Sequence, residues 1–335
     1  MELKCPVCER VVSMNQSVID CPHCGFEYPF IQYFCNKKSL DLWKTKIRNK
    51  RDRLRTDKIE SLSKSGRFTL GSDTVSIIDS ANSISILGED SFEERENVIG
   101  YSRSERNYAI LFKDGNIEVR GDNSYGQCDI ETDKSAVSVL CAPNCTYIVT
   151  DDGRVEYFGA ELDKSIKTWK NVIDLAAGSF HLLGLTRDGN VLIAGEMIEK
   201  NVLDKIAGWK NVKSICAATD CSIALFNDGK VSFAGRPNDP RGVVDHWEDI
   251  VSIHADSSYT VGLTSNGTIN ISGKCKSFLD MGRSSVAAWN NVMAVSCSKS
   301  GIAGIFDDGT IKIVGNYSGN IEKTCDNWKK HIKIT

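Results

Sequence analysis

The stretch WKNVIDLAAGSFHLLGLTRDGNVLIAG, residues 169–195, decides the fold, because most of the chain after residue 66 repeats its pattern. A tryptophan precedes a short apolar segment, which ends at a turn of small residues, Ala177-Gly178. A second apolar segment, 181–186, leads into Asp188-Gly189, a dipeptide that favours a tight β-hairpin, and a third segment ends at Gly195. The stretch therefore predicts three short strands joined by tight turns.

The copies of this unit recur at a nearly constant spacing. The glycines that close the third strand are 38, 36, 40, 38 and 42 residues apart, at Gly121, Gly159, Gly195, Gly235, Gly273 and Gly315. An earlier copy, 74–88, aligns with 181–195 without a gap although it lacks the Asp-Gly turn. Seven such units predict a ring, because a closed ring buries both faces of each small sheet and leaves no sheet edge exposed.

The repeat resembles that of the regulator of chromosome condensation family. The features it shares are the Trp-x-Asn-Val start, the Ala-Ala-Gly-x-x-His turn, the Leu-Thr-x-Asp-Gly hairpin and the closing glycine, and 121–128 is similar to that family's Gly-x-Asn-x-x-Gly-Gln tail. The resemblance covers 67–335 and implies an all-β, seven-bladed β-propeller. The units are shorter than eukaryotic ones and resemble those of bacterial propellers such as the secreted beta-lactamase inhibitory protein, so the eukaryotic exchange activity on a nuclear GTPase is not expected.

Composition and charge divide the chain into three parts. The 335 residues carry a net charge of −3, but 37–67 hold 12 basic and 4 acidic residues. We expect a zinc ribbon at 1–36, a basic helical linker at 37–66 and the propeller at 67–335. No run of 18 apolar residues indicates a membrane span, and the first residues lack the apolar core of a signal peptide. With 13 cysteines as well, we expect a cytoplasmic monomer whose thiols are not oxidised.

Two Cys-x-x-Cys pairs near the N-terminus predict a structural zinc site. The pairs are separated by 12 residues, a spacing that lets two turns face each other and present four thiolates in a tetrahedron. A closed site of four sulfur ligands leaves no open position for a substrate, and so short a segment takes its folding energy from the metal. The predicted ligands of this zinc are Cys5, Cys8, Cys21 and Cys24.

The basic segment is open to two interpretations. Ser39 is a candidate helix cap and Gly66 a candidate helix stop, with a sparse apolar stripe between them. The lysines and arginines around that stripe suit nucleic acid or another acidic surface, and they equally suit a solvated helical spacer. Trp43 is the only aromatic residue among the charges, so stacking against single-stranded nucleic acid is not indicated.

Binding residues of a repeat protein are expected where the repeat varies. The turn between the first and second strands differs in every unit, and these turns should surround one mouth of a central channel; unconstrained loops would vary in the same way. The candidate partner-binding residues in these turns are Asp73, Arg106, Phe180, His181, Asp220 and Tyr259. A long connection contributes the apolar residues Phe278, Leu279 and Met281 as a second candidate, and the turn-rich loop 236–241 is a third.

None of the five histidines lies in a recognisable nucleophile, metal-hydrolase or phosphate-binding motif. We therefore expect a non-catalytic module that binds or inhibits a protein partner through one propeller face. The alternatives are a nucleic-acid-associated adaptor that uses the ribbon and linker and, as a weaker one, a propeller enzyme. The segment 328–335 resembles the opening of a further unit, so we also expect 330–335 to pair in the first sheet.

Overall fold

The computed structural model describes residues 2–5, 7, 11–13, 21, 37–62, 67–71, 74–79, 81–88, 92–160, 162–195, 199–274 and 282–315. These residues belong to two compact units, 1–59 and 60–335. The second unit contains all seven predicted repeats.

The first unit holds a small hairpin and a long helix. Strand β1, Glu2–Lys4, pairs antiparallel with β2, Val11–Ser13, on either side of the first Cys-x-x-Cys turn. Helix α1, Lys37–Leu62, begins two residues before the predicted cap, and its last residues belong to the second unit. Its basic side chains Lys44, Lys46 and Arg48 are exposed, as expected of a solvated helix face.

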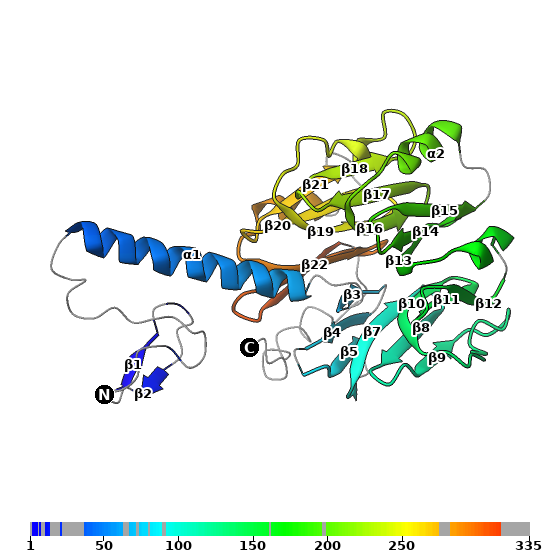
Figure 1. The fold of residues 1–335 in the computed structure, drawn as a ribbon, viewed down its shortest axis with the longest axis horizontal. Coiled ribbons are helices and arrows are strands. Elements are labelled where there is room, and N and C mark those ends of the chain that lie inside the picture. The colour runs from blue at the N-terminus through cyan, green and yellow to red at the C-terminus, as the bar shows by residue number, and fades with distance from the viewer. Residues whose placement is uncertain are drawn as a thin grey trace. The chain divides into compact units, whose positions relative to one another are not determined.

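Seven antiparallel sheets follow one another along the second unit, and Figure 1 shows them in colour order. We number them as blades 1 to 7. The first has four strands and the others have three, and their order within each sheet is the order in the sequence. The strands of blades 1 to 4 are β3 Phe68–Leu70, β4 Thr74–Ile78, β5 Ile84–Gly88 and β6 Phe92–Arg95; β7 Val98–Arg103, β8 Asn107–Phe112 and β9 Ile117–Gly121; β10 Ala136–Ala142, β11 Cys145–Thr150 and β12 Val155–Gly159; β13 Val172–Ala177, β14 His181–Thr186 and β15 Val191–Gly195.

The strands of blades 5 to 7 are β16 Val212–Ala218, β17 Cys221–Phe226 and β18 Val231–Ala234; β19 Ile250–Ala255, β20 Tyr259–Thr264 and β21 Ile269–Gly273; β22 Val292–Ser298, β23 Gly301–Phe306 and β24 Ile311–Gly315. Short helices connect several blades: the 3-10 helices η2 Lys164–Thr168, η3 Pro240–Gly242 and η5 Arg283–Ala288, and the α-helix α2 Lys200–Ala207. The predicted seven units are thus confirmed, and the sequence missed the fourth strand of blade 1.

The ring closes where blade 7 meets blade 1. The first strand of each blade contacts the first strand of the next, and β22 contacts β3. At this junction the Leu70 N–H donates to Ser296 Oγ at 3.1 Å, and the Ser298 hydroxyl donates to the Gly71 carbonyl at 3.2 Å. Residues 330–335, expected in this sheet, lie outside the described residues; the inner position of the sheet is taken by β3.

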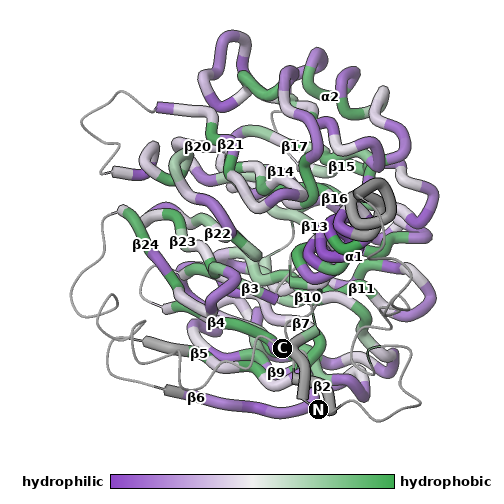
Figure 2. Tube along the Cα trace, turned by 90° about the vertical axis from the view of Figure 1, so that its left-hand side faces the viewer, coloured by the Kyte–Doolittle hydropathy of each residue, from purple (hydrophilic) through white to green (hydrophobic). Residues whose placement is uncertain are grey.

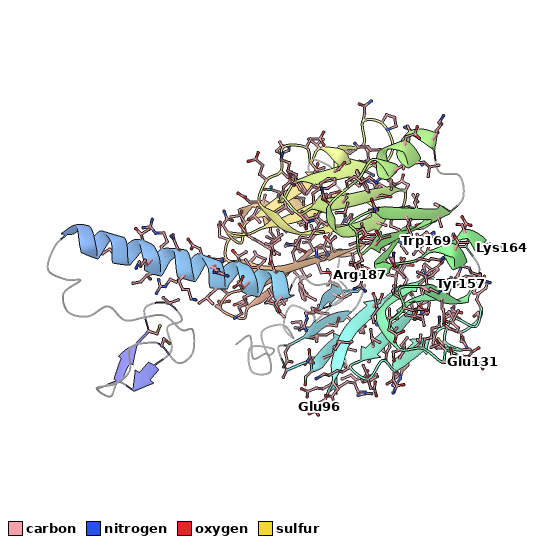
Figure 3. The ribbon with its side chains drawn as sticks, viewed as in Figure 1. Glu96, Glu131, Tyr157, Lys164, Trp169 and Arg187 are labelled. Atoms are coloured by element: carbon pink, nitrogen blue, oxygen red, sulfur yellow. The ribbon has the colours of Figure 1, made fainter. Side chains whose placement is uncertain are left out.

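Apolar side chains fill the spaces between neighbouring blades. Trp169 is buried among Tyr147 and Val149 of blade 3 and Leu175 and Leu182 of blade 4, and Figure 3 shows it among these strands. Trp209 and Trp247 occupy the same place between the next two pairs of blades. The prediction that these tryptophans pack between blades is therefore confirmed. Figure 2 shows that the connections are largely hydrophilic, as is β6, the outermost strand of blade 1, which suits an exposed sheet edge.

The closing glycines let the end of the third strand approach the turn before the second strand. Gly195 has a φ of +143°, and a Cβ there would lie 2.3 Å from the Phe180 carbonyl oxygen. Equivalent contacts, at 2.2 to 2.4 Å, would occur in the four other blades whose closing glycine has a positive φ, at Gly121, Gly159, Gly273 and Gly315. No other residue type fits this position without displacing the turn.

We predict that Gly195→Ala lowers the free energy of unfolding by about 3 kcal/mol or more, because the clash adds to the strain of the positive φ. Gly282→Ala is the matched control, since Gly282 has a φ of +80° but no atom within 4 Å of the added Cβ. That variant should lose only about 1 kcal/mol. Urea denaturation of both variants measures the difference, and an equal loss would show that close approach is not the constraint.

Candidate protein-binding surface

The turns between the first and second strands lie at one end of all seven sheets, and we call this end the turn face. Neighbouring turns contact one another: the Ser179 N–H donates to the Thr219 carbonyl at 3.1 Å. Lys299 of blade 7 pairs with Glu105 of blade 2 at 3.4 Å. The turn of blade 4 therefore contacts that of blade 5, and the turn of blade 7 contacts that of blade 2, at one mouth of the channel.

Two of the predicted partner-binding residues on this face, His181 and Tyr259, are buried. His181 Nε2 lies 3.0 Å from Ser222 Oγ of the next blade, and burial lowers the pKa of the imidazole below its ordinary value. Tyr259 donates through its hydroxyl to the Lys274 carbonyl at 3.2 Å. Asn107, at the same repeat position, bonds Thr146 of the next blade at 3.3 Å. The side chain at this position thus joins two blades at His181 and Asn107, and at Tyr259 it is buried against its own blade.

The residue just before the repeat position of His181 is the one that reaches solvent in blades 2 and 4. Phe180 is 64% exposed, the largest exposure among the exposed large hydrophobic residues of the described chain. Arg106 is also exposed and pairs with Asp122 at 3.4 Å. Asp220 is partly buried, where it accepts from Arg241 at 2.6 Å and pairs with Arg236 at 3.2 Å. Four further predicted residues lie outside the described residues: Asp73, Phe278, Leu279 and Met281.

A cavity of about 770 Å³ occupies the centre of the ring and is lined by the first strands of all seven blades. These strands form the inner edges of their sheets, so the N–H groups that point away from the sheet need acceptors elsewhere. Ser102 Oγ accepts from the Cys141 N–H of the next blade at 2.9 Å, and Ser296 accepts from Leu70 in the same way. The small hydroxyl side chains around the channel thus protect open sheet edges.

Two titratable side chains within the channel are strongly affected by their surroundings. Desolvation raises the pKa of Asp174 to about 6, although the Leu175 N–H, at 2.9 Å, and the Ser138 hydroxyl donate to its carboxylate. Desolvation also lowers the pKa of His254, whose Nε2 lies 3.0 Å from Ser252 Oγ, to about 4. Near pH 7 the imidazole is therefore neutral and the carboxylate is charged at a cost in stability.

The opposite mouth of the channel carries an arc of exposed aliphatic side chains that the sequence analysis missed. Ile99, Val137 and Ile173 occupy the second position of the first strand in blades 2, 3 and 4, and each is between 36% and 49% exposed. In blade 5 the same position is Lys213, which pairs with Glu60 at 2.7 Å. The sequence could have indicated this arc, because each of these three positions is apolar where the alternation of the strand predicts a polar residue.

No metal site or membrane-spanning helix is found in the part of the chain that the structure describes. No group of three or more His, Cys, Asp or Glu side chains there is arranged to hold a metal ion. Of the four predicted zinc ligands, Cys5 and Cys21 are buried, while Cys8 and Cys24 lie outside the described residues. No described helix is both long and apolar enough to cross a bilayer.

Comparison with known proteins identifies the fold. No protein-family model and no curated protein sequence matches the chain. Among solved structures, the ectodomain of the Physcomitrella patens receptor kinase CR4 is similar, with a TM-score of 0.58, 16% identity and coverage of 74% of this chain and 72% of that one. The ectodomain of the Arabidopsis thaliana receptor kinase ACR4 has a TM-score of 0.55 and 12% identity, with coverage of 75% and 96%.

The third similar structure is yeast RCC1 (Prp20), solved bound to Kap60, with a TM-score of 0.52, 15% identity and coverage of 65% of this chain and 70% of that one. The seven sheets and these similarities show a β-propeller fold like that of yeast RCC1 (Prp20) and the two receptor kinase ectodomains. The predicted fold class is therefore confirmed, and identities this low show the fold alone.

We predict that Asp174→Asn raises the melting temperature at pH 8 but not at pH 4. The unfolded carboxyl has a pKa of about 3.9, so the higher pKa in the fold makes stability fall as pH rises from about 4 to 6. Asparagine removes this charge and keeps an acceptor for Ser138. Thermal melts at both pH values test this, with Asp188→Asn at an exposed hairpin turn as the control. Equal shifts of the Asp174 variant at both pH values would contradict the prediction.

Proposed function

We propose that this protein is a non-catalytic binding module that holds a protein partner on the turn face of its propeller. The observation that carries the proposal is Phe180, a large aromatic side chain that is 64% exposed at the edge of a channel mouth. The turns of blades 2 and 7 add exposed charged side chains to this face, namely Arg106, Glu105 and Lys299. An exposed aromatic anchor with a charged rim is the usual composition of a protein-binding hot spot.

We propose further that the first unit contains a ribbon stabilised by zinc. One observation in favour of the zinc site is the hairpin of β1 and β2, whose two strands flank the first cysteine pair. Further support comes from Cys5 and Cys21, which are both buried, and from the Val7 N–H, which donates to Cys5 Sγ at 3.5 Å. Buried thiolates that accept backbone N–H groups suit a structural tetrahedral zinc site, with Cys8 and Cys24 as the remaining ligands.

A second candidate function uses helix α1. Five of its basic side chains between residues 44 and 53 are exposed: Lys44, Lys46, Arg48, Arg51 and Arg53. Such a helix face could bind the phosphates of nucleic acid through charge alone, with an affinity that falls steeply as salt rises. The two functions are separated by testing whether a captured partner survives nuclease treatment.

We predict that Phe180→Ala weakens partner binding at least about 30-fold, because truncation of a central aromatic anchor costs about 2 kcal/mol or more. The full chain is immobilised and exposed to a nuclease-treated extract of the source cells, and the affinity of the recovered protein is measured by calorimetry. Ile173→Ser, at the opposite mouth, is the matched control and should bind normally. If only the Ile173 variant loses binding, the partner docks on the opposite face; if nuclease removes all captured material, the α1 alternative is favoured.

We also predict about one zinc per chain in metal analysis of the pure protein. Replacement of Cys21 and Cys24 by serine should abolish zinc binding, because two neutral hydroxyls cannot replace two thiolates. The propeller should melt unchanged in this variant, since its core is contained within 60–335. Full zinc content in the double variant would rule out these ligands.

A further inference from the structure

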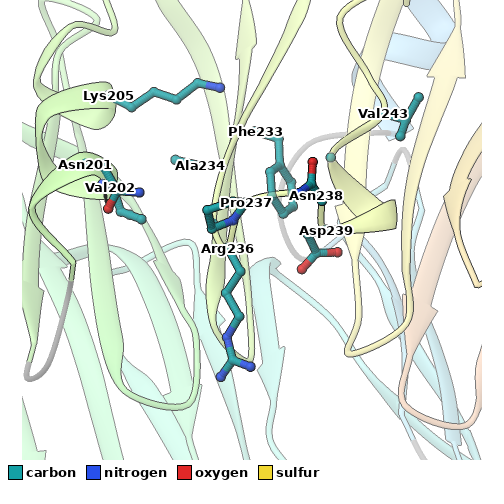
Figure 4. A pocket seen from close by; sticks show the side chains of 12 residues that line it. Asn201, Val202, Lys205, Phe233, Ala234, Arg236, Pro237, Asn238, Asp239 and Val243 are labelled. Atoms are coloured by element: carbon teal, nitrogen blue, oxygen red, sulfur yellow. Dashed lines mark hydrogen bonds between the residues drawn. The ribbon is translucent and has the colours of Figure 1, made fainter.

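A pocket of about 400 Å³ lies where two departures from the repeat meet. First, an α-helix, α2, follows blade 4, whereas 3-10 helices follow blades 3, 5 and 6. Second, β18 ends at Ala234, and the closing glycine of blade 5, Gly235, lacks the positive φ found at the closing glycines of blades 2, 3, 4, 6 and 7. The chain then forms the loop 236–239, which lines the pocket opposite α2, as Figure 4 shows.

The walls of this pocket are fixed by the fold. Phe233 is held between two glycines: a Cβ at either Gly235 or Gly242 would lie 2.7 Å from its ring. Asp239 caps η3, with its Oδ1 accepting from the Arg241 N–H at 2.9 Å, and it also binds the buried Arg241 guanidinium. The wall formed by Phe233 and Asp239 is therefore ordered before a ligand enters, and the volume of the pocket lies within the range of about 300–1,000 Å³ typical of ligand pockets.

The charge that the pocket offers to a ligand is positive. Its charged lining residues are Lys205, Arg236 and Asp239. Both carboxylate oxygens of Asp239 bind Arg241, and these bonds outweigh burial to hold the pKa of Asp239 below its ordinary value. Lys205 and Arg236 are exposed, and Figure 4 shows Lys205 extending sideways from α2 and Arg236 extending downward from the loop.

Apolar surface lies beside these cations. Val243 is 60% exposed at the rim, and Val202 and Pro237 line the pocket together with the Phe233 ring. Positive charge next to apolar surface is complementary to an acidic peptide that carries an apolar side chain.

The pocket is also linked to the turn face. Arg236 Nε lies 3.2 Å from Asp220 Oδ2, and Asp220 belongs to the turn of blade 5. The neighbouring turn residue Thr219 accepts from Ser179, which precedes Phe180 in the chain. A partner that contacts Phe180 can therefore extend a segment into the pocket.

We propose that the pocket binds an acidic segment of the partner, with one apolar side chain between Val202 and Val243 and carboxylates on Lys205 and Arg236. This inference rests on the proposed function, whose partner it describes chemically. Arg236 can exchange Asp220 for a carboxylate of the ligand, because Asp220 keeps its 2.6 Å bond to the buried Arg241.

The experiment uses a library of random twelve-residue peptides displayed on phage and selected against the immobilised full chain. Selected peptides should carry an aliphatic or aromatic residue flanked by at least two aspartates or glutamates. Their affinity, measured by fluorescence polarisation, should fall at least tenfold in the double variant Lys205→Glu, Arg236→Glu. The control variant Lys210→Glu, Lys230→Glu makes the same change in net charge at other exposed sites and should bind normally. Val243→Asp tests the apolar wall independently and should also weaken binding.

Neutral or basic selected peptides, undiminished binding by the double variant, or selection of no peptide would overturn the inference. Thermal melts establish that each variant is folded. Phe180→Ala should leave peptide binding unchanged while it weakens the natural partner. If the selected peptides do not bind the pocket but Phe180→Ala still weakens the natural partner, only this inference fails. If the peptides bind as expected but Phe180→Ala leaves the natural partner unaffected, the proposed function fails.

Discussion

The propeller depends on packing between blades, because a sheet of three short strands cannot bury either face alone. Every blade buries one face against the preceding blade and the other against the next, and a tryptophan such as Trp169 fills the space at one edge of the interface. The same requirement places serines at the inner strand edges, where Ser102 and Ser296 accept N–H groups of neighbouring blades. Stability is therefore a property of the ring and cannot be assigned to single blades.

Much of this architecture could be predicted from the sequence, since turns and spacing are local signals. The glycines of the Asp-Gly dipeptides and five of the closing glycines have positive φ angles, which glycine adopts far more readily than residues with a side chain. The fourth strand of blade 1 could not be predicted this way, because 92–95 are largely charged and pair only as an outer edge. The residues of β6 form a strand because β5 offers them an edge to pair with, and their own hydrophobic pattern does not predict a strand.

The candidate site was predicted less well, because variation between repeats does not distinguish exposed positions from buried ones. The residue type at the position of His181 and Tyr259 differs between repeats, yet both side chains are buried. His181 bonds Ser222 of the next blade, and Tyr259 bonds the Lys274 carbonyl of its own blade. Phe180, one residue earlier than His181, is exposed because it lies in the turn before β14, whose six residues are all buried. The pocket beside α2 combines residues about 30 positions apart, so only the fold brings Lys205 and Arg236 together.

The closure of the ring between blades 7 and 1 has a consequence for synthesis on the ribosome. Phe68 and Leu70 of the first blade are covered by Ile305 and Ile313 of the last. During translation this apolar face is made first and covered last, after more than two hundred residues have been added. The nascent chain thus carries an uncovered hydrophobic surface for most of its synthesis, which is the situation in which molecular chaperones are needed.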